Sequence, residues 1–143
     1  EFNGNGHTIR NFKLQYNKQT QGDLYIAIFP YLNEATVQDV TFDNFSVDVE
    51  TQNTRTQNVY ISSLAGRAKG AIINNVAVSN YTVNISSRTN RPLEYDLSKA
   101  IFEDEDGNST VTNFSITQTT MNDLRVTAEA VSLYQITLEK TLY

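Results

Sequence analysis

The 143-residue sequence lacks several residue types, and each absence excludes a class of protein. It contains no cysteine, which excludes disulfide cross-links, cysteine-ligated zinc and thiol catalysis. It has no tryptophan, one histidine and only two prolines. Basic residues are also few, with 11 Lys and Arg against 16 Asp and Glu, giving a formal net charge of -5. This balance disfavours nucleic-acid binding, because such binding depends largely on Lys and Arg at phosphate groups.

Long hydrophobic runs are missing as well. The longest, Leu24 to Leu32, is about half of the roughly 20 residues that a membrane-spanning helix needs. The chain begins at Glu1 rather than Met, and no basic segment followed by an apolar core indicates a signal peptide. We therefore expect no membrane span, and we expect the chain to belong to a longer polypeptide.

What the sequence does contain is a repeat. A six-residue phrase of the form aliphatic, any, Asn or Asp, Phe or Val, any, apolar recurs at intervals of roughly 28 to 38 residues. It occurs at Ile9–Leu14, Val37–Phe42, Ile73–Val78 and Val111–Ile116. Asn and Thr are common along the chain at the expense of helix-forming residues. The repeat therefore predicts strands and turns rather than helices.

Further apolar segments flank the phrase. Alternating runs follow it at Phe45–Val49 and Tyr81–Ile85, and apolar runs precede it at Ile26–Leu32 and Ile61–Ala68. Three short strands per repeat are typical of a solenoid, in which stacked coils share one core. The sequence thus predicts an all-β parallel solenoid of about four three-strand coils over residues 1–121. Residues 122–143 are predicted to form a degenerate last coil or cap, with a short helix over Ala128–Tyr134 as the alternative.

The third position of the phrase predicts a corner. Apolar residues lie three apart across it, which reverses the buried face unless the chain bends there. Asn and Asp tolerate left-handed backbone conformations and bond to nearby backbone groups. We expect these residues to stack as a corner ladder, and the alternative for Asp39 is an acid or a metal ligand. The predicted ladder is Asn11, Asp39, Asn75 and Asn113.

Three segments resemble a known class of repeats: FNGNGHTIRNFKL from Phe2, IFPYLNEATVQDVTF from Ile28, and SLAGRAKGAIINNVAVSNYTV from Ser63. Over residues 2–121 they are similar to the GLUG-type β-solenoid repeats of bacterial surface proteins. The resemblance implies a right-handed parallel β-helix. Such helices belong to adhesins, or accompany the protease domain of immunoglobulin-A-cleaving surface metalloproteases. The chain departs from the family pattern at Ala27, Pro30 and Ser63, where the family has glycine, and keeps Gly66.

Candidate binding residues lie in three loops of variable length, at 15–23, 50–58 and 86–96. In a solenoid, insertions at equivalent positions project from the same edge. Each loop has a cation among amides and hydroxyls, with tyrosines at the flanks, so this edge could bind a glycan or an acidic protein patch; the alternative is a solvated edge. The residues concerned are Tyr16, Lys18, Arg55, Arg88, Arg91 and Tyr95.

An acidic segment, Glu103 to Asn108, is the candidate metal site. Asp104, Asp106 and Asn108 have the alternating spacing of the first half of a calcium loop. No Glu follows at the distance that would supply the bidentate ligand, so a charged, solvated turn is the alternative reading. We expect no cofactor.

Catalysis is not predicted. Asp39 and Asp43 are the nearest approach to a carboxylate pair, and His7 lies in a glycine-rich turn with no partners for Ser-His-Asp chemistry. The sequence favours a non-catalytic, extracellular or cell-surface segment that acts as an adhesin platform or stalk. Expected partners are a glycan, a host or surface protein, the rest of a longer polypeptide, or a second copy at the N-terminal open edge. Alternatives are a filament or sheath subunit, an accessory region of a surface protease, and a carbohydrate-active enzyme.

Overall fold

The computed structural model describes residues 1–16, 22–50, 56–86 and 93–124, which form strands and turns without a helix. Three parallel sheets result, each with its strands in chain order. The long sheet contains β1 (Phe2–Tyr16), β4 (Thr36–Val49), β7 (Ile72–Ile85) and β10 (Thr110–Asp123). The second contains β2 (Gly22–Ile26), β5 (Thr56–Ile61) and β8 (Leu93–Tyr95). The third contains β3 (Phe29–Asn33), β6 (Ala65–Lys69) and β9 (Ile101–Asp104).

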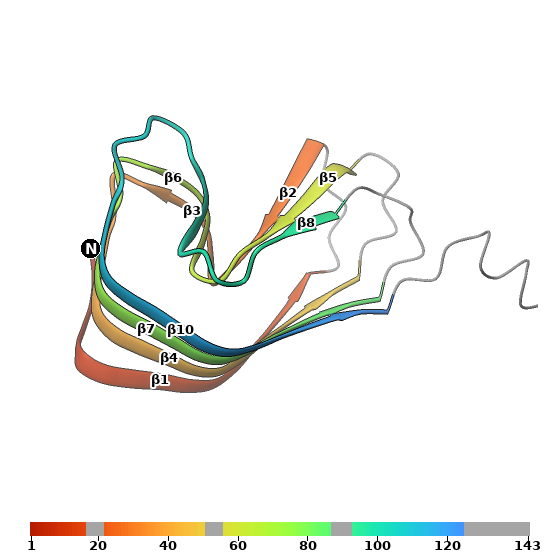
Figure 1. Ribbon diagram of the computed structural model, residues 1–143, viewed down its shortest axis with the longest axis horizontal. Helices are drawn as coiled ribbons and strands as arrows, with labels where there is room; N and C mark the ends of the chain where they lie inside the picture. The colour runs from red at the N-terminus through yellow and green to blue at the C-terminus, as the bar shows by residue number, and fades with distance from the viewer. Residues whose placement is uncertain (17–21, 51–55, 87–92, 125–143) are drawn as a thin grey trace, which may run out of the picture.

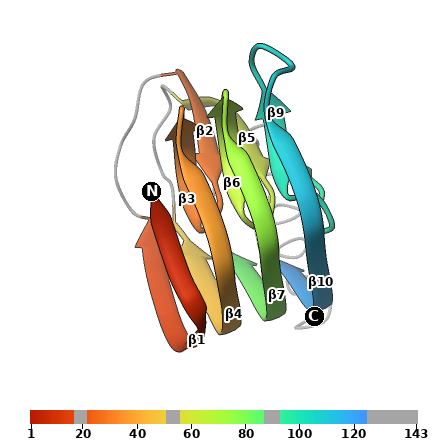
Figure 2. The same cartoon turned by 90° about the vertical axis from the view of Figure 1, so that its left-hand side faces the viewer.

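The arrangement is a parallel β-helix of three-strand coils, which confirms the predicted fold. One strand from each sheet makes a coil, so β1, β2 and β3 are followed by β4, β5 and β6, and then by β7, β8 and β9 (Figure 1). Figure 2 shows the strands of the long sheet side by side from β1 to β10. Within the described residues β10 alone represents the fourth coil, and most of the predicted cap, from 125 onward, lies outside them. No helix capable of crossing a membrane occurs in the described part of the chain.

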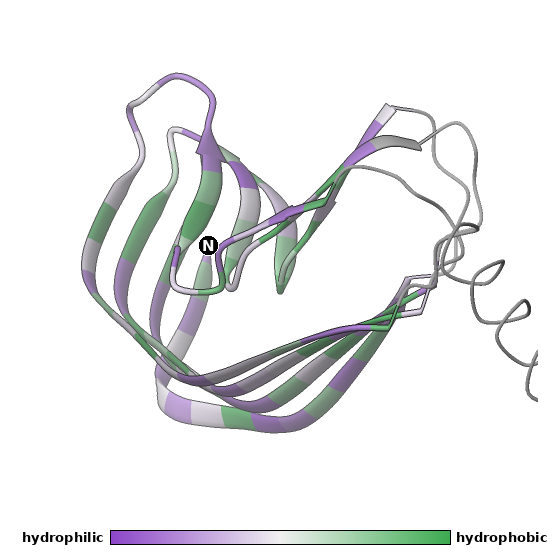
Figure 3. Cartoon of the chain, turned by 45° about the vertical axis from the view of Figure 1, so that its right-hand side comes forward, coloured by the Kyte–Doolittle hydropathy of each residue, from purple (hydrophilic) through white to green (hydrophobic). Residues whose placement is uncertain are grey.

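The core lies between the three sheets and runs along the stack. Alternate residues of each strand face it, as the alternating hydropathy in Figure 3 shows. Each inward position forms a column of apolar residues through the coils; one column contains Phe12, Phe45 and Tyr81, with ring centroids 4.4 and 5.6 Å apart. The largest fully buried side chains are Tyr81, Phe42, Phe45, Ile26, Ile61 and Leu64. All six belong to the first three coils.

The long-sheet strands bend twice, and the pairing of β4, β7 and β10 resumes in the same register after each bend. At the first bend Asp39, Asn75 and Asn113 have φ values of 55°, 56° and 53°. These three residues form the predicted corner ladder, with Asn75 Nδ2 donating to Asp39 Oδ1 and Asn113 Nδ2 to Asn75 Oδ1, both at 2.9 Å. The second bend, five residues later, again has residues of positive φ: Asn44, Asn80 and Gln118. Short polar side chains in this conformation explain the high asparagine content.

The prediction for Asn11 was wrong. Asn11, with φ 61°, belongs to the second bend, where its Oδ1 accepts a hydrogen bond of 2.8 Å from Asn44 Nδ2. The register pairs Ile9 with Phe42 and Phe2 with Val37, so the phrase at Ile9–Leu14 is equivalent to 42–47 rather than 37–42. The second bend follows a close variant of the same pattern, with Phe at the first position in 42–47 (FDNFSV) and Tyr at the fourth in 78–83 (VSNYTV). Asparagine suits either bend, and the pattern alone does not separate them.

Strand boundaries also differ from the prediction. The phrase and the run after it form one bent strand, whereas the predicted runs Ile26–Leu32 and Ile61–Ala68 are each divided between two sheets. The division in the second coil is made by two fully buried serines. Ser62 Oγ donates to the carbonyl of Ala65 and Ser63 Oγ to that of Lys99, both at 2.6 Å. The two hydroxyls thus provide hydrogen bonds to backbone carbonyl groups at the point where the chain leaves one sheet and enters the next.

A polar cleft at the ends of the long sheet

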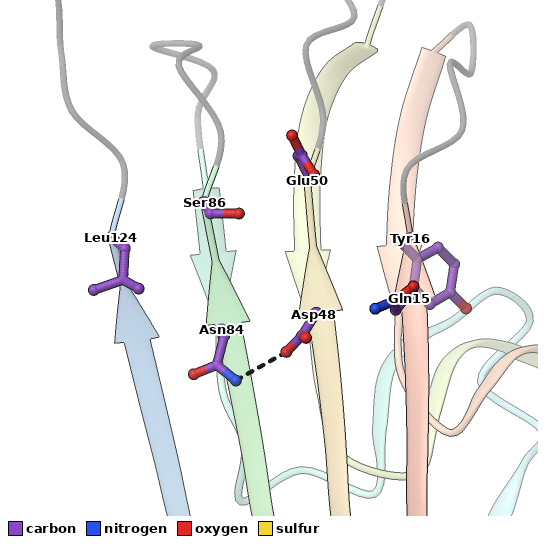
Figure 4. A pocket seen from close by; sticks show the side chains of 7 residues that line it. All are labelled: Gln15, Tyr16, Asp48, Glu50, Asn84, Ser86 and Leu124. Atoms are coloured by element: carbon purple, nitrogen blue, oxygen red, sulfur yellow. Dashed lines mark hydrogen bonds between the residues drawn. The ribbon is translucent and has the colours of Figure 1, made fainter.

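The candidate site lies where the strands of the long sheet end. Seven residues from four successive coils line a cleft of about 370 Å³. They are Gln15 and Tyr16 at the end of β1, Asp48 and Glu50 at the end of β4, Asn84 and Ser86 at the end of β7, and Leu124 after β10 (Figure 4). Because the strands are parallel and in register, equivalent residues of each coil meet at this one edge.

Asp48 is the electrostatic centre of the cleft. Its Oδ1 accepts a 2.9 Å hydrogen bond from Asn84 Nδ2, and its Oδ2 lies 3.0 Å from Lys13 Nζ. The hydrogen bond from Asn84 and then the contact with Lys13 lower the pKa of the Asp48 carboxyl below its ordinary value. The carboxylate is therefore ionised at neutral pH. It can accept hydrogen bonds from a ligand, and it has no proton to give as a general acid.

Amides and hydroxyls surround this carboxylate. Asn84 Oδ1 accepts from Asn122 Nδ2 at 2.8 Å, so the Asn84 side chain is held by hydrogen bonds on both sides. Burial raises the pKa of the Tyr16 phenol, which stays protonated at neutral pH as donor and acceptor. Gln15, Glu50 and Ser86 are exposed. The cleft thus offers donors and acceptors with a surplus of negative charge, which suits ligands rich in hydroxyl groups and without anionic groups.

The structure brings part of the predicted loop edge together. Tyr16 lines the cleft, whereas Tyr95 lies on β8, is 53% exposed and is not among the lining residues. The four predicted cations, Lys18, Arg55, Arg88 and Arg91, lie outside the described residues. The strands entering this edge end in register at Tyr16, Val49 and Ile85. The variable segments therefore begin beside the cleft.

Four of the lining residues belong to the predicted loops, namely Gln15, Tyr16, Glu50 and Ser86, whereas Asp48, Asn84 and Leu124 were not predicted. Gln15, Asp48, Asn84 and Asn122 occupy one outward column, the last outward position before each strand ends. The signal was present, because Gln15, Asp48 and Asn84 each lie between two apolar residues. Reading the outward residues of the alternating runs, rather than the inward ones, would have found it.

The acidic segment bonds both to its own turn and to earlier coils, where Arg67 pairs with Glu103 and Glu105. Asp106 Oδ1 accepts from the backbone N–H of Asn108 at 3.1 Å and from that of Gly70 at 3.4 Å, and Asp104 Oδ2 accepts from Ser109 N–H at 3.1 Å. The first of these bonds is the main reason that the pKa of Asp106 is lowered. Across the described ranges, no group of three or more His, Cys, Asp and Glu is placed to hold a metal ion. Asp104 and Asp106 thus accept hydrogen bonds from backbone N–H groups in this turn, and the calcium loop stays a prediction.

A cluster of aromatic side chains lies away from the cleft, on β2, β5 and β9. The rings of Tyr25, Tyr60 and Phe102 lie 5.0 and 5.1 Å apart along the stack, and Arg67 lies over the Tyr25 ring at 5.4 Å. Tyr25 packs against Gly66, where an added Cβ would lie 2.7 Å from the Tyr25 Cβ. The rings contact one another and the guanidinium, which leaves less aromatic face for stacking on a sugar. We therefore assign this cluster a packing role.

No protein-family model matches the chain, and no match is found among curated proteins or solved structures.

Proposed function

We propose that this chain is a non-catalytic β-solenoid segment of an extracellular surface protein, acting as an adhesin platform that binds uncharged glycans in the polar cleft. The single observation that supports this most directly is the cleft itself: amide, hydroxyl and carboxylate groups from successive coils converge on one concave edge. Planar amides and carboxylates bind vicinal sugar hydroxyls through paired hydrogen bonds. The extracellular role rests on the resemblance of the repeats to those of bacterial surface proteins.

The charge of the cleft supports an uncharged ligand. Asp48 is ionised and Glu50 is exposed beside it, so a sialylated or uronic-acid glycan would meet like charge. Lys13 lies 3.0 Å from Asp48 and, within the described residues, forms no ion pair with Glu50. The cleft also spans several coils, which matches an extended oligosaccharide rather than a single small molecule.

The proposal is tested by screening the full chain against an array of neutral and acidic oligosaccharides and titrating each positive by calorimetry. We expect neutral glycans to bind and Asn84→Ala to weaken their affinity at least tenfold. Asn74→Ala is the matched control, because Asn74 is an exposed residue of the same strand outside the cleft. Its affinity should equal that of the parent.

A triple variant, Arg55, Arg88 and Arg91 each to Ala, separates the cleft from the predicted loop cations. Retention of neutral-glycan binding by this variant supports recognition by the cleft. Loss of binding in the triple variant with Asn84→Ala unaffected would assign recognition to the loops instead. Failure of the parent chain to bind any neutral glycan would overturn the proposal.

A further inference from the structure

The side-chain amides bond between coils in one direction, whereas the Tyr25 and Tyr31 hydroxyls donate the other way, to Glu103 and Glu105. In the described residues, every amide that bonds to a side chain of another coil donates to the preceding coil. Examples are Asn44 to Asn11, Asn75 to Asp39 and Asn122 to Asn84. The solenoid therefore has two chemically different ends. Amide N–H groups are available at the β1 end and amide oxygens at the β10 end.

The two end strands match in this respect. Asn11 Nδ2 and the Gln15 amide on β1 make no hydrogen bond in the described part of the chain, and neither do the side-chain oxygens of Gln118 and Asn122 on β10. Column by column, Asn11 is equivalent to Gln118 and Gln15 to Asn122. A β1 strand stacked on β10 would therefore continue both ladders with donors facing acceptors.

Among the described residues, apolar columns are also exposed on both end strands. On β1, Phe2, Ile9 and Phe12 are 36%, 38% and 37% exposed, and on β10 Val111 is 45% exposed. The register that continues the amide ladders places Phe2 over Val111, which lines a hollow of about 630 Å³ beside β9. Solenoids normally need polar capping repeats at their ends to stay apart, and the described ends of this one present core residues instead.

Edge protection differs between the two strands. β1 has a bulge between Asn3 and His7 and contains Arg10 and Lys13, features that discourage strand pairing. β10 is a 14-residue strand without proline, Lys or Arg, and its one acidic residue, Asp123, is the last. A long uncharged edge of this kind recruits a further strand.

We propose that β10 of one copy binds β1 of a second copy in parallel, head to tail, with Ile116 beside Ile9 and Asn122 beside Gln15. A two-fold contact between two β10 edges would place acceptor against acceptor, so the amide polarity selects the heterologous contact. Such a contact leaves a free edge at each end of the dimer and therefore propagates. The partner is this chain itself, and the contact shares Gln15 with the cleft.

Sedimentation velocity of the full chain over a hundredfold concentration range tests association. The weight-average mass should rise from 16.1 kDa toward several times that value. Val111→Lys on β10 and Ile9→Lys on β1 should each hold the chain as a monomer, because each buries a charge in the contact. The controls Thr112→Lys and Thr8→Lys place the same charge on exposed outward neighbours and should associate as the parent does.

Mixing the two blocked variants tests direction. A head-to-tail contact predicts that Val111→Lys and Ile9→Lys together form one heterodimer and stop there, since only one intact β1 and one intact β10 remain. Self-dimerisation of Ile9→Lys alone would instead show a two-fold contact and overturn the proposal. A parent that sediments as a monomer at every concentration would overturn it as well.

The register is tested by cross-linking, for which the cysteine-free sequence is a clean background. Facing residues of paired strands are within disulfide reach. Ile116→Cys mixed with Ile9→Cys should give a covalent heterodimer on oxidation. The control mixes Ile116→Cys with Leu14→Cys, which lies five residues from Ile9 along β1. This pair should give no covalent heterodimer. The reverse result would exclude the proposed pairing.

Discussion

Single asparagines determine the shape of each coil. A residue at a bend must adopt a left-handed backbone, which costs most L-residues roughly 1–2 kcal/mol. Asn75 meets this requirement with φ 56° and also bonds to Asp39 and Asn113 through its side chain. One residue therefore serves both the backbone turn and the contact between coils.

Substitution at Asn75 separates these two roles. Asn75→Gly keeps the bend and loses two hydrogen bonds, whereas Asn75→Ala also pays the backbone strain. We expect both to lower the free energy of unfolding in urea, with Ala about 1 kcal/mol below Gly. Asn74, an exposed strand residue without positive φ, is the control and should show the opposite order. An Ala variant as stable as the Gly variant at position 75 would contradict the strained bend.

Two hydrogen-bonded carboxylates on β4, Asp43 and Asp48, make the stability of the fold depend on pH. The pKa of Asp43 is lowered by hydrogen bonds from Asn80 and Ser79, and that of Asp48 by Asn84 and then Lys13. A carboxyl whose pKa is lower in the folded state stabilises the fold above its unfolded pKa, about 3.9 for Asp. That contribution is lost as the pH falls through the folded value.

We therefore expect the free energy of unfolding to be constant near neutrality and to fall below about pH 4. Asp48→Asn should be less stable at pH 7 and should show a shallower loss in acid. The control, Glu94→Gln, changes an exposed carboxylate that makes no hydrogen bond in the described residues, and should leave the acid limb unchanged. Denaturant titrations at several pH values measure both. An acid limb as steep in Asp48→Asn as in the parent would exclude the Asp48 ladder as its source.

How much of each element follows from the sequence depends on how local its determinants are. Alternation along Val37–Val49 fixes which residues face the core, and the Asn or Asp at positions 39, 75 and 113 fixes the first bend. The second bend is hidden, because Asn44 and Asn80 look the same as the first-bend residues. The cleft requires the register across coils, which no single coil encodes.

Across the whole molecule, stability is shared between neighbouring coils. β4 and β7 each pair on both sides, whereas β1 and β10 each pair on one side among the described strands. In a linear stack, outer units open before inner ones. Amides of β4 and β7 should therefore exchange with deuterium most slowly, and those of β1 and β10 at least tenfold faster at low protein concentration. Equal protection in all four strands would contradict this order.

The register of the sheets also governs how quickly the chain can fold. Val37 pairs with Ile73 and Thr41 with Ala77, so each pairing between the described strands joins residues a full coil apart in sequence, and none of these pairings is a hairpin. Each coil must lose the entropy of closing a long loop before its stabilising contacts form. Folding is slow in proteins dominated by such distant pairings. Once two coils have paired, each later coil forms its strands against an edge that is already ordered. Folding should thus be limited by the first pair of coils and proceed from there by addition.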